Sequence, residues 1–186
     1  MQRKFLSLSL LALVVLLVPQ LRGEEAGDDQ AFFDKHVGQF VKLAPKRLTS
    51  EALPKIFSAT FYNVGVSIGE DGGGTTLTVA RVGDEIAQVT TPSSSAEMPA
   101  FVKLVKEDFV LKTDADAHLL QDALDVLYPI DSRFSPEDVN LKAIRHKANQ
   151  FTFVRGKFFD NVKGFVVTTD AVGKITSVKY SLEESK

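Results

Sequence analysis

The chain contains no cysteine and no tryptophan among its 186 residues. The absence of cysteine excludes disulfide scaffolds, cysteine-ligated zinc sites, thiol catalysis and iron–sulfur clusters. Glycine and proline number 12 and 7, the hydrophobic share is 44% and the charged share 25%. These values exclude a collagenous or low-complexity chain and predict one globular domain of modest size.

Only the beginning of the chain has a long hydrophobic run. Arg3 and Lys4 precede an apolar stretch over residues 5–18, and Gly23 is the last small residue before acidic residues begin. This arrangement is typical of a secretory signal peptide over residues 1–23, and we expect cleavage after Gly23. A run of 14 residues is short for a bilayer span of about 20. We therefore expect residues 24–186 to form one secreted or periplasmic domain that does not span a membrane.

Removal of the predicted signal peptide leaves 19 basic against 24 acidic residues, a net charge of −5. A negative chain does not favour nucleic-acid binding. Basic residues nevertheless gather late in the sequence, where Arg145, Arg155 and Lys157 are the predicted binding residues for an anionic small ligand. The alternative interpretation is that these side chains are simply solvated positions of a helix and an edge strand.

The first half of the predicted domain combines one helix with a meander. Apolar residues at three- and four-residue spacing predict an amphipathic helix over residues 27–46. Alternating apolar residues predict three antiparallel strands over residues 56–68, 76–82 and 85–90. A Thr-Pro-Ser-Ser-Ser segment over residues 91–95 predicts the loop that ends this half.

The second half begins with helices. A short helix is predicted over residues 96–105, and a capping pair at Thr113 and Asp116 opens a longer helix that continues to Tyr128. Ser135 and Pro136 predict a further helix start, with Ile144 on its inner face. Strands are predicted over residues 109–112, 151–159, 165–169 and 175–182, with a bulge at Gly156.

Both halves, about residues 30–90 and 96–182, thus place an antiparallel meander after a helix. This order predicts an α+β fold in which helices pack on one face of antiparallel sheet. Duplication of one helix-plus-meander unit is a hypothesis.

Two motifs suggest catalysis but lack the required context. Gly65, Ser67 and Gly69 fit the Gly-x-Ser-x-Gly pattern, which needs a helix directly after the serine. Here a glycine-rich turn and another strand are predicted instead. The glycine-rich segment 69–75 lacks the Gly-Lys-Ser/Thr ending of a phosphate-binding loop. We therefore predict no catalytic residue and no cofactor.

Asp114, His118 and Asp122 lie at i, i+4 and i+8 of the predicted helix and are the best candidate metal ligands. A ladder of this length is too long for one ion to contact all three, so a solvated helix face is the alternative.

The periodic apolar residues are almost fully explained by a folded core. The leading hypothesis is therefore a non-catalytic binding domain of the cell envelope, with an envelope protein or an anionic small ligand as partner. The alternative is a small exported hydrolase or metal-dependent enzyme with a site assembled from Asp, Glu and His. A purely structural module of a larger assembly is a third possibility.

Overall fold

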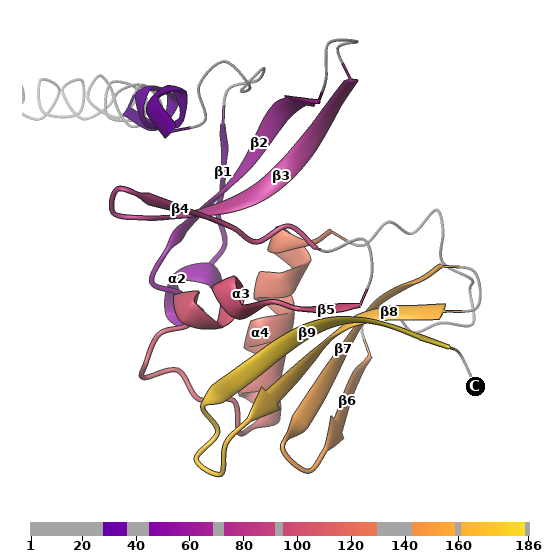
Figure 1. The fold of residues 1–186 in the computed structure, drawn as a ribbon. Helices are drawn as coiled ribbons and strands as arrows, with labels where there is room; N and C mark the ends of the chain where they lie inside the picture. Colours follow the sequence, from indigo (N-terminus) through magenta and orange to yellow (C-terminus); the bar gives the residue numbers. More distant parts are fainter. Residues whose placement is uncertain are drawn as a thin grey trace, which may run out of the picture. The chain divides into compact units, whose positions relative to one another are not determined.

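The chain folds as α+β with two antiparallel sheets, as predicted (Figure 1). The computed structural model describes residues 28–36, 45–68, 73–91, 95–129, 143–158 and 161–184. The predicted signal peptide, the predicted helix start at Ser135 and most of the serine-rich loop lie outside these residues. No helix in the described part of the chain combines the length and the apolar character of a bilayer span.

The chain divides into two compact units, residues 1–45 with 64–76 and residues 46–63 with 77–186. In the first unit, residues 28–36 are helical, in agreement with the prediction for that part of the chain. Phe32 and Phe33 are buried on this helix, with ring centroids 5.3 Å apart in an edge-to-face arrangement. His36 lies one turn further on and is exposed, and its Nδ1 lies 2.8 Å from the Phe32 carbonyl oxygen.

The first sheet has the order β1-β2-β3-β4. Its strands are β1 (Lys46–Leu48), β2 (Thr60–Ile68), β3 (Gly73–Val82) and β4 (Glu85–Gln88). The last three confirm the predicted meander, although its first strand begins at Thr60 and not at residue 56, because residues 53–56 are helical. β1 was too short to predict. Gly83 closes the β3–β4 turn with a φ of 58°, a conformation that favours glycine. Ser67 lies within β2, and the next described element is a strand, so the context of a catalytic serine turn is missing there.

The second sheet lies wholly in the second unit and has the order β5-β9-β8-β7-β6. Its strands are β5 (Ala96–Glu97), β6 (Ile144–Lys147), β7 (Gln150–Phe158), β8 (Asn161–Thr169) and β9 (Ile175–Glu184). The register of β7 against β8 shifts between Val154 and Gly156, which confirms the predicted bulge. The helix predicted through Ile144 is wrong at its end, because Ile144 already pairs with Phe153 across a hairpin.

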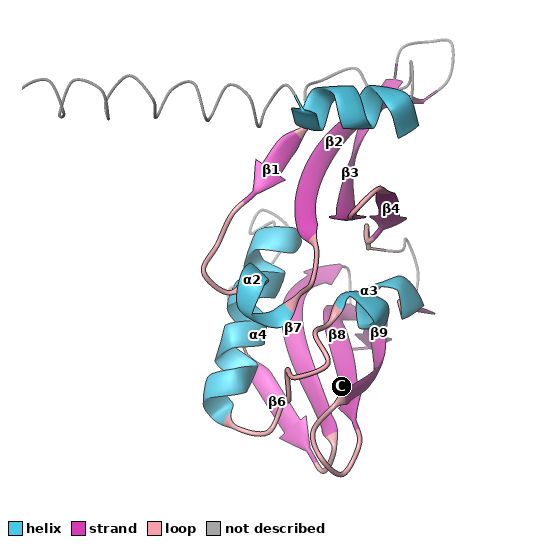
Figure 2. Cartoon of the chain, turned by 90° about the vertical axis from the view of Figure 1, so that its left-hand side faces the viewer, coloured by secondary structure: helices cyan, strands magenta, loops and turns pink. Residues whose placement is uncertain are grey.

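Helices α2 (Leu53–Ile56), α3 (Pro99–Leu104) and α4 (Asp114–Leu127) contribute to one core with a single face of this sheet (Figure 2). α3 begins later than predicted because residues 96–97 pair with β9 instead. The strand predicted at residues 109–112 is also wrong, since that segment is irregular: its Phe109 N–H donates to the nearby Lys106 carbonyl and its Leu111 N–H to the Gly173 carbonyl.

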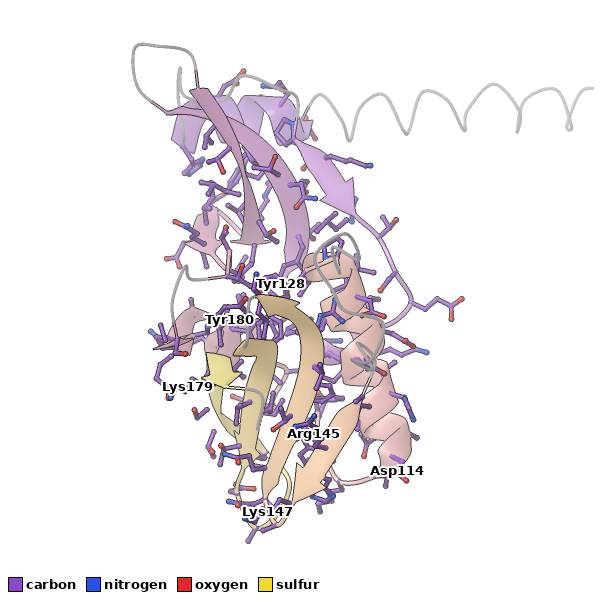
Figure 3. The ribbon with its side chains drawn as sticks, turned by 90° about the vertical axis from the view of Figure 1, so that its right-hand side faces the viewer. Asp114, Tyr128, Arg145, Lys147, Lys179 and Tyr180 are labelled. Atoms are coloured by element: carbon purple, nitrogen blue, oxygen red, sulfur yellow. The ribbon has the colours of Figure 1, made fainter. Side chains whose placement is uncertain are left out.

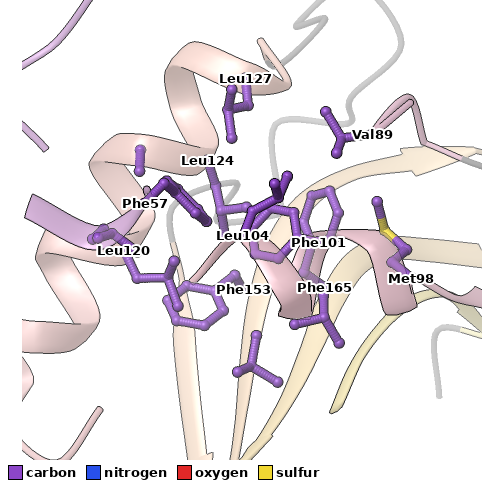
Figure 4. Packing of buried hydrophobic residues seen from close by; sticks show 14 of the residues in the cluster. Phe57, Val89, Met98, Phe101, Leu104, Leu120, Leu124, Leu127, Phe153 and Phe165 are labelled. Carbon is purple, nitrogen blue, oxygen red and sulfur yellow. The ribbon is translucent and has the colours of Figure 1, made fainter. Parts of the chain in front are cut away.

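The core lies between these helices and the sheet (Figure 4). Phe101, Leu120, Phe153 and Phe165 are fully buried, and each such side chain contributes about 1.5 to 3 kcal/mol of transfer free energy. The sheet side of the core consists of Phe151, Phe153, Phe165, Val167, Val178 and Tyr180. Because side chains alternate along a strand, the residues between them lie on the opposite face of the sheet.

Candidate functional site

The start of α4 is fixed by the predicted capping pair. Thr113 Oγ1 accepts a hydrogen bond from the Asp116 N–H at 3.2 Å, and Asp116 Oδ2 accepts one from the Thr113 N–H at 2.8 Å. Burial alone would raise the pKa of Asp116, but the hydrogen bonds from Thr113 and Lys112 outweigh it and hold that pKa below its usual value. This cap therefore places the first turns of α4, which carry Asp114 and His118.

A hollow of about 420 Å³ lies beside these first turns, and we call it the α4–β6 hollow. It contains two of the three histidines of the chain, His118 from α4 and His146 from β6, together with the carboxylate of Asp114. The other lining residues are apolar: Ala117, Ala143, Ile144 and Phe151. The sequence placed His118 and His146 almost thirty positions apart, so only the packing of α4 against the sheet brings them to one hollow.

His146 and Phe151 line this hollow and also a second hollow of about 260 Å³, which lies next to the turn at Ala148 and Asn149. Their rings stack with centroids 4.0 Å apart and an interplanar angle of 10°. The His146 Nε2 lies 2.6 Å from the Ala148 carbonyl oxygen. Because a carbonyl can only accept, Nε2 is the protonated nitrogen, which leaves Nδ1 as an acceptor in the neutral ring.

The predicted metal ladder is only partly gathered in one place. Asp114 and His118 share the α4–β6 hollow with His146, while Asp122 is exposed and does not line it. Among the described residues, no group of three or more His, Asp or Glu side chains is arranged to hold a metal ion.

The three predicted anion ligands are not gathered either. Arg155 is the inserted residue of the β7 bulge, its side chain is 5% exposed, and it forms an ion pair with Asp125 of α4. Arg155 Nη2 donates to the carbonyls of Leu124 and Tyr128. The Leu124 carbonyl also accepts the Tyr128 N–H at 2.8 Å. Tyr128 is the C-cap residue of α4, so its own carbonyl lies beyond the last bond within the helix. Arg155 therefore caps the C-terminus of α4 from the inner face of the sheet.

Arg145 lies on the opposite face. It pairs with Thr152, which alternates with the buried Phe151 and Phe153, so Arg145 points away from α4. The Lys157 side chain lies outside the described part of the structure.

The strand register places Arg145 in a row of neighbouring residues that crosses the whole sheet. Thr152 pairs with Val166, Val166 with Lys179, and Lys179 with Glu97. A second row starts at Lys147 and continues through Gln150, Thr168 and Ser177. We call these nine residues the outer face. They are Arg145, Thr152, Val166, Lys179, Glu97, Lys147, Gln150, Thr168 and Ser177.

Three cations and one carboxylate lie on the outer face. Arg145, Lys147 and Lys179 are exposed, and Figure 3 shows all three labelled on the sheet. Glu97 accepts a hydrogen bond from the Ser177 hydroxyl at 2.8 Å. The outer face therefore carries a net charge of +2, although the chain as a whole has a formal charge of −2.

Two tyrosines have perturbed pKa values because they are buried. Desolvation raises the pKa of Tyr128 and, less strongly, that of Tyr180. The Tyr128 hydroxyl donates to the Val89 carbonyl, and its ring lies 4.7 Å from that of Phe165. Both tyrosines thus pack in the core and line neither of the two hollows.

Comparison of the chain with protein-family models, with curated proteins and with solved structures found no match. The sequence did not place His146 and Lys147 at a common site, because no strand was predicted over residues 144–147. The hairpin closes through the two residues Ala148 and Asn149, and this pair is not one of the glycine-containing pairs that mark such turns in a sequence.

Proposed function

We propose that this protein is an exported, non-catalytic binding domain of the cell envelope that presents its outer face to an acidic surface of a partner protein. The observation that carries the proposal is the strand register that places three exposed cations against a single carboxylate on one face. Complementary charge guides association and selects the partner.

The dimensions of the outer face favour a protein over a small anion. Arg145 and Lys179 lie in one row with two strands between them, which separates their backbones by about 14 Å. Side chains stand roughly perpendicular to a sheet, so one small anion would not contact both. Threonine, serine and glutamine between the cations supply hydrogen-bond donors and acceptors for a polar interface.

Photo-crosslinking in the native envelope tests this proposal. A photoreactive residue at Thr152 should give crosslinks to an acidic protein, and one at the exposed Asp122 of α4 should not. The crosslinks should fall at high salt, because surface charges are screened beyond about 10 Å at 0.1 M ionic strength. Equal crosslinking from both positions would contradict the proposal.

Charge reversal gives a second test of the same surface. The triple variant Arg145→Glu, Lys147→Glu and Lys179→Glu should abolish the Thr152 crosslink while the protein remains folded. A control with the same change in net charge should keep the crosslink; it reverses three exposed lysines outside the outer face, Lys55, Lys103 and Lys174. Loss of the crosslink in both variants would show that net charge alone governs binding.

A second candidate function is a small exported hydrolase or metal-dependent enzyme. The observation that favours it is the gathering of Asp114, His118 and His146 around one hollow. A histidine whose Nδ1 can accept a proton, in the same hollow as a carboxylate, has the chemistry of a general base. If this is the function, the His118→Gln and His146→Gln variants should lose hydrolytic activity in a substrate screen, whereas the charge-reversed triple variant should retain it.

A further inference from the structure

Strand β6 forms one edge of the five-stranded sheet. The Val154 N–H donates to the Ala143 carbonyl at 3.0 Å, so these two residues are a hydrogen-bonded pair. Hydrogen-bonded and non-hydrogen-bonded pairs alternate along an antiparallel ladder. Arg145 and Lys147 therefore direct their backbone groups toward β7, and Ile144 and His146 direct theirs outward. The close His146–Phe151 stack agrees with this phase, because side chains approach most closely at non-hydrogen-bonded pairs.

No described strand pairs with the outward groups of Ile144 and His146. Such an edge can accept a further strand. The side chains beside this edge differ between the two faces of the sheet. Arg145 and Lys147 lie on the outer face, whereas Ile144 and His146 line the α4–β6 hollow.

We infer that β6 accepts an extended segment of the partner protein as an additional antiparallel strand, with acidic and apolar side chains in alternation. Its acidic residues would lie beside Arg145 and Lys147, and its apolar residues would enter the α4–β6 hollow. The hollow, at about 420 Å³, falls within the size range of ligand pockets, and four of its seven lining residues are apolar. This inference rests on the proposed function, because it names the segment by which the acidic partner binds.

Charge decides the occupant of the edge. A second copy of this chain would bring Arg145 and Lys147 against the same cations across a shared edge, and like charges directly opposite one another destabilise a strand pair. Basic edge strands are also a common protection against aggregation. With an acidic segment, by contrast, these cations would stabilise the added strand.

The probe for this inference is a short peptide of alternating glutamate and valine, titrated into the chain from residue 24 onward. In an added antiparallel strand the valines, on the same face as Ile144 and His146, direct their N–H groups to β6. Methylation of the valine nitrogens should weaken binding at least tenfold, because it removes the hydrogen bonds that these N–H groups would donate to β6. Methylation of the glutamate nitrogens should change it less than about twofold. Equal effects of the two methylations would overturn the inference.

Amide exchange provides an internal control. On peptide binding, exchange at the Ile144 and His146 N–H groups should slow at least tenfold, and exchange at Arg145 and Lys147 should stay unchanged because those groups already face β7. Unchanged exchange at all four positions despite binding would refute strand addition.

Two variants separate this inference from the proposed function. The double variant Arg145→Glu with Lys147→Glu should weaken binding of the peptide at least tenfold. Lys179→Glu, at the far side of the sheet, should leave binding of the peptide unchanged. If the Thr152 crosslink persists but the methylated peptides bind alike, only strand addition fails. If the peptide adds to β6 but the Thr152 crosslink persists in the charge-reversed triple variant, only the outer-face proposal fails.

Discussion

Replacement of Arg155 by methionine tests whether this cation is structural or binds a ligand. Methionine keeps a long apolar side chain but removes the guanidinium, which joins Asp125 to the last carbonyls of α4. The side chain is 5% exposed and the Asp125 side chain 29% exposed. Arg155→Met thus removes a largely buried cation while preserving most of the apolar packing around its stem.

The expected effect follows from the bonds that are lost. Hydrogen bonds to charged groups contribute about 1.5 to 3 kcal/mol each, and breaking a buried ion pair by removing one partner costs about 3 to 5 kcal/mol. Two gains offset this loss, because the variant no longer desolvates a guanidinium and no longer buries Nε, which has no partner among the described residues. We expect Arg155→Met to lower the free energy of unfolding by roughly 2 to 4 kcal/mol.

Urea unfolding of the wild type, Arg155→Met, Asp125→Asn and the double variant measures this effect. Asp125→Asn should cost less, about 1 to 2 kcal/mol, because the carboxylate is partly solvated. The double-mutant cycle should give a coupling of about 1 to 3 kcal/mol between the two residues. The reasoning is refuted if Arg155→Met costs less than about 0.5 kcal/mol and also abolishes a sulfate-dependent rise in melting temperature, which would identify Arg155 as a ligand group.

Three further predictions concern the backbone and the cap of α4. Gly164→Ala should lower the free energy of unfolding by about 1 to 3 kcal/mol in urea titrations, because the new Cβ would lie 2.7 Å from the Phe153 carbonyl oxygen; an unchanged value would show that the strands separate easily. Ala148→Gly should raise stability by about 0.5 to 1 kcal/mol, since the alanine has a φ of 53°. Asp116→Asn should lower the melting temperature at pH 6 but change it less at pH 3. The pKa of Asp116 is depressed in the fold, so its contribution is present above its unfolded pKa of 3.8 and is lost as pH falls through the folded pKa.

The sequence was most informative where local chemistry decides the structure. The cap of α4 followed from the spacing of Thr113 and Asp116, because both partners of a capping box lie within one turn. Long alternating segments predicted β7, β8 and β9, and Gly156 marked the bulge. Each of these features depends on neighbours within a few residues.

Short strands and long-range contacts were the features that the sequence did not indicate. β6 has four residues, which is too few for periodicity to distinguish a strand from the end of a helix. The gathering of His118 and His146 depends on how α4 packs against the sheet, and no local pattern encodes that packing. The candidate metal ligands were likewise chosen from α4 alone. The hollow instead contains His146 from β6 and not Asp122.

The different surroundings of Arg145 and Arg155 show how sheet geometry separates residues of equal charge. In the β6–β7 hairpin, Arg145 pairs with Thr152 and His146 with Phe151, so odd-numbered residues of β6 share a face with even-numbered residues of β7. Arg145 therefore lies on the outer face, while Arg155 lies with the core and caps α4. Because side chains alternate with a period of two, one additional residue in the Ala148–Asn149 turn would exchange the two faces of β6. It would then place Arg145 against α4 and His146 toward solvent. The two-residue length of this turn is thus the feature that keeps one cation exposed while the other stabilises the fold.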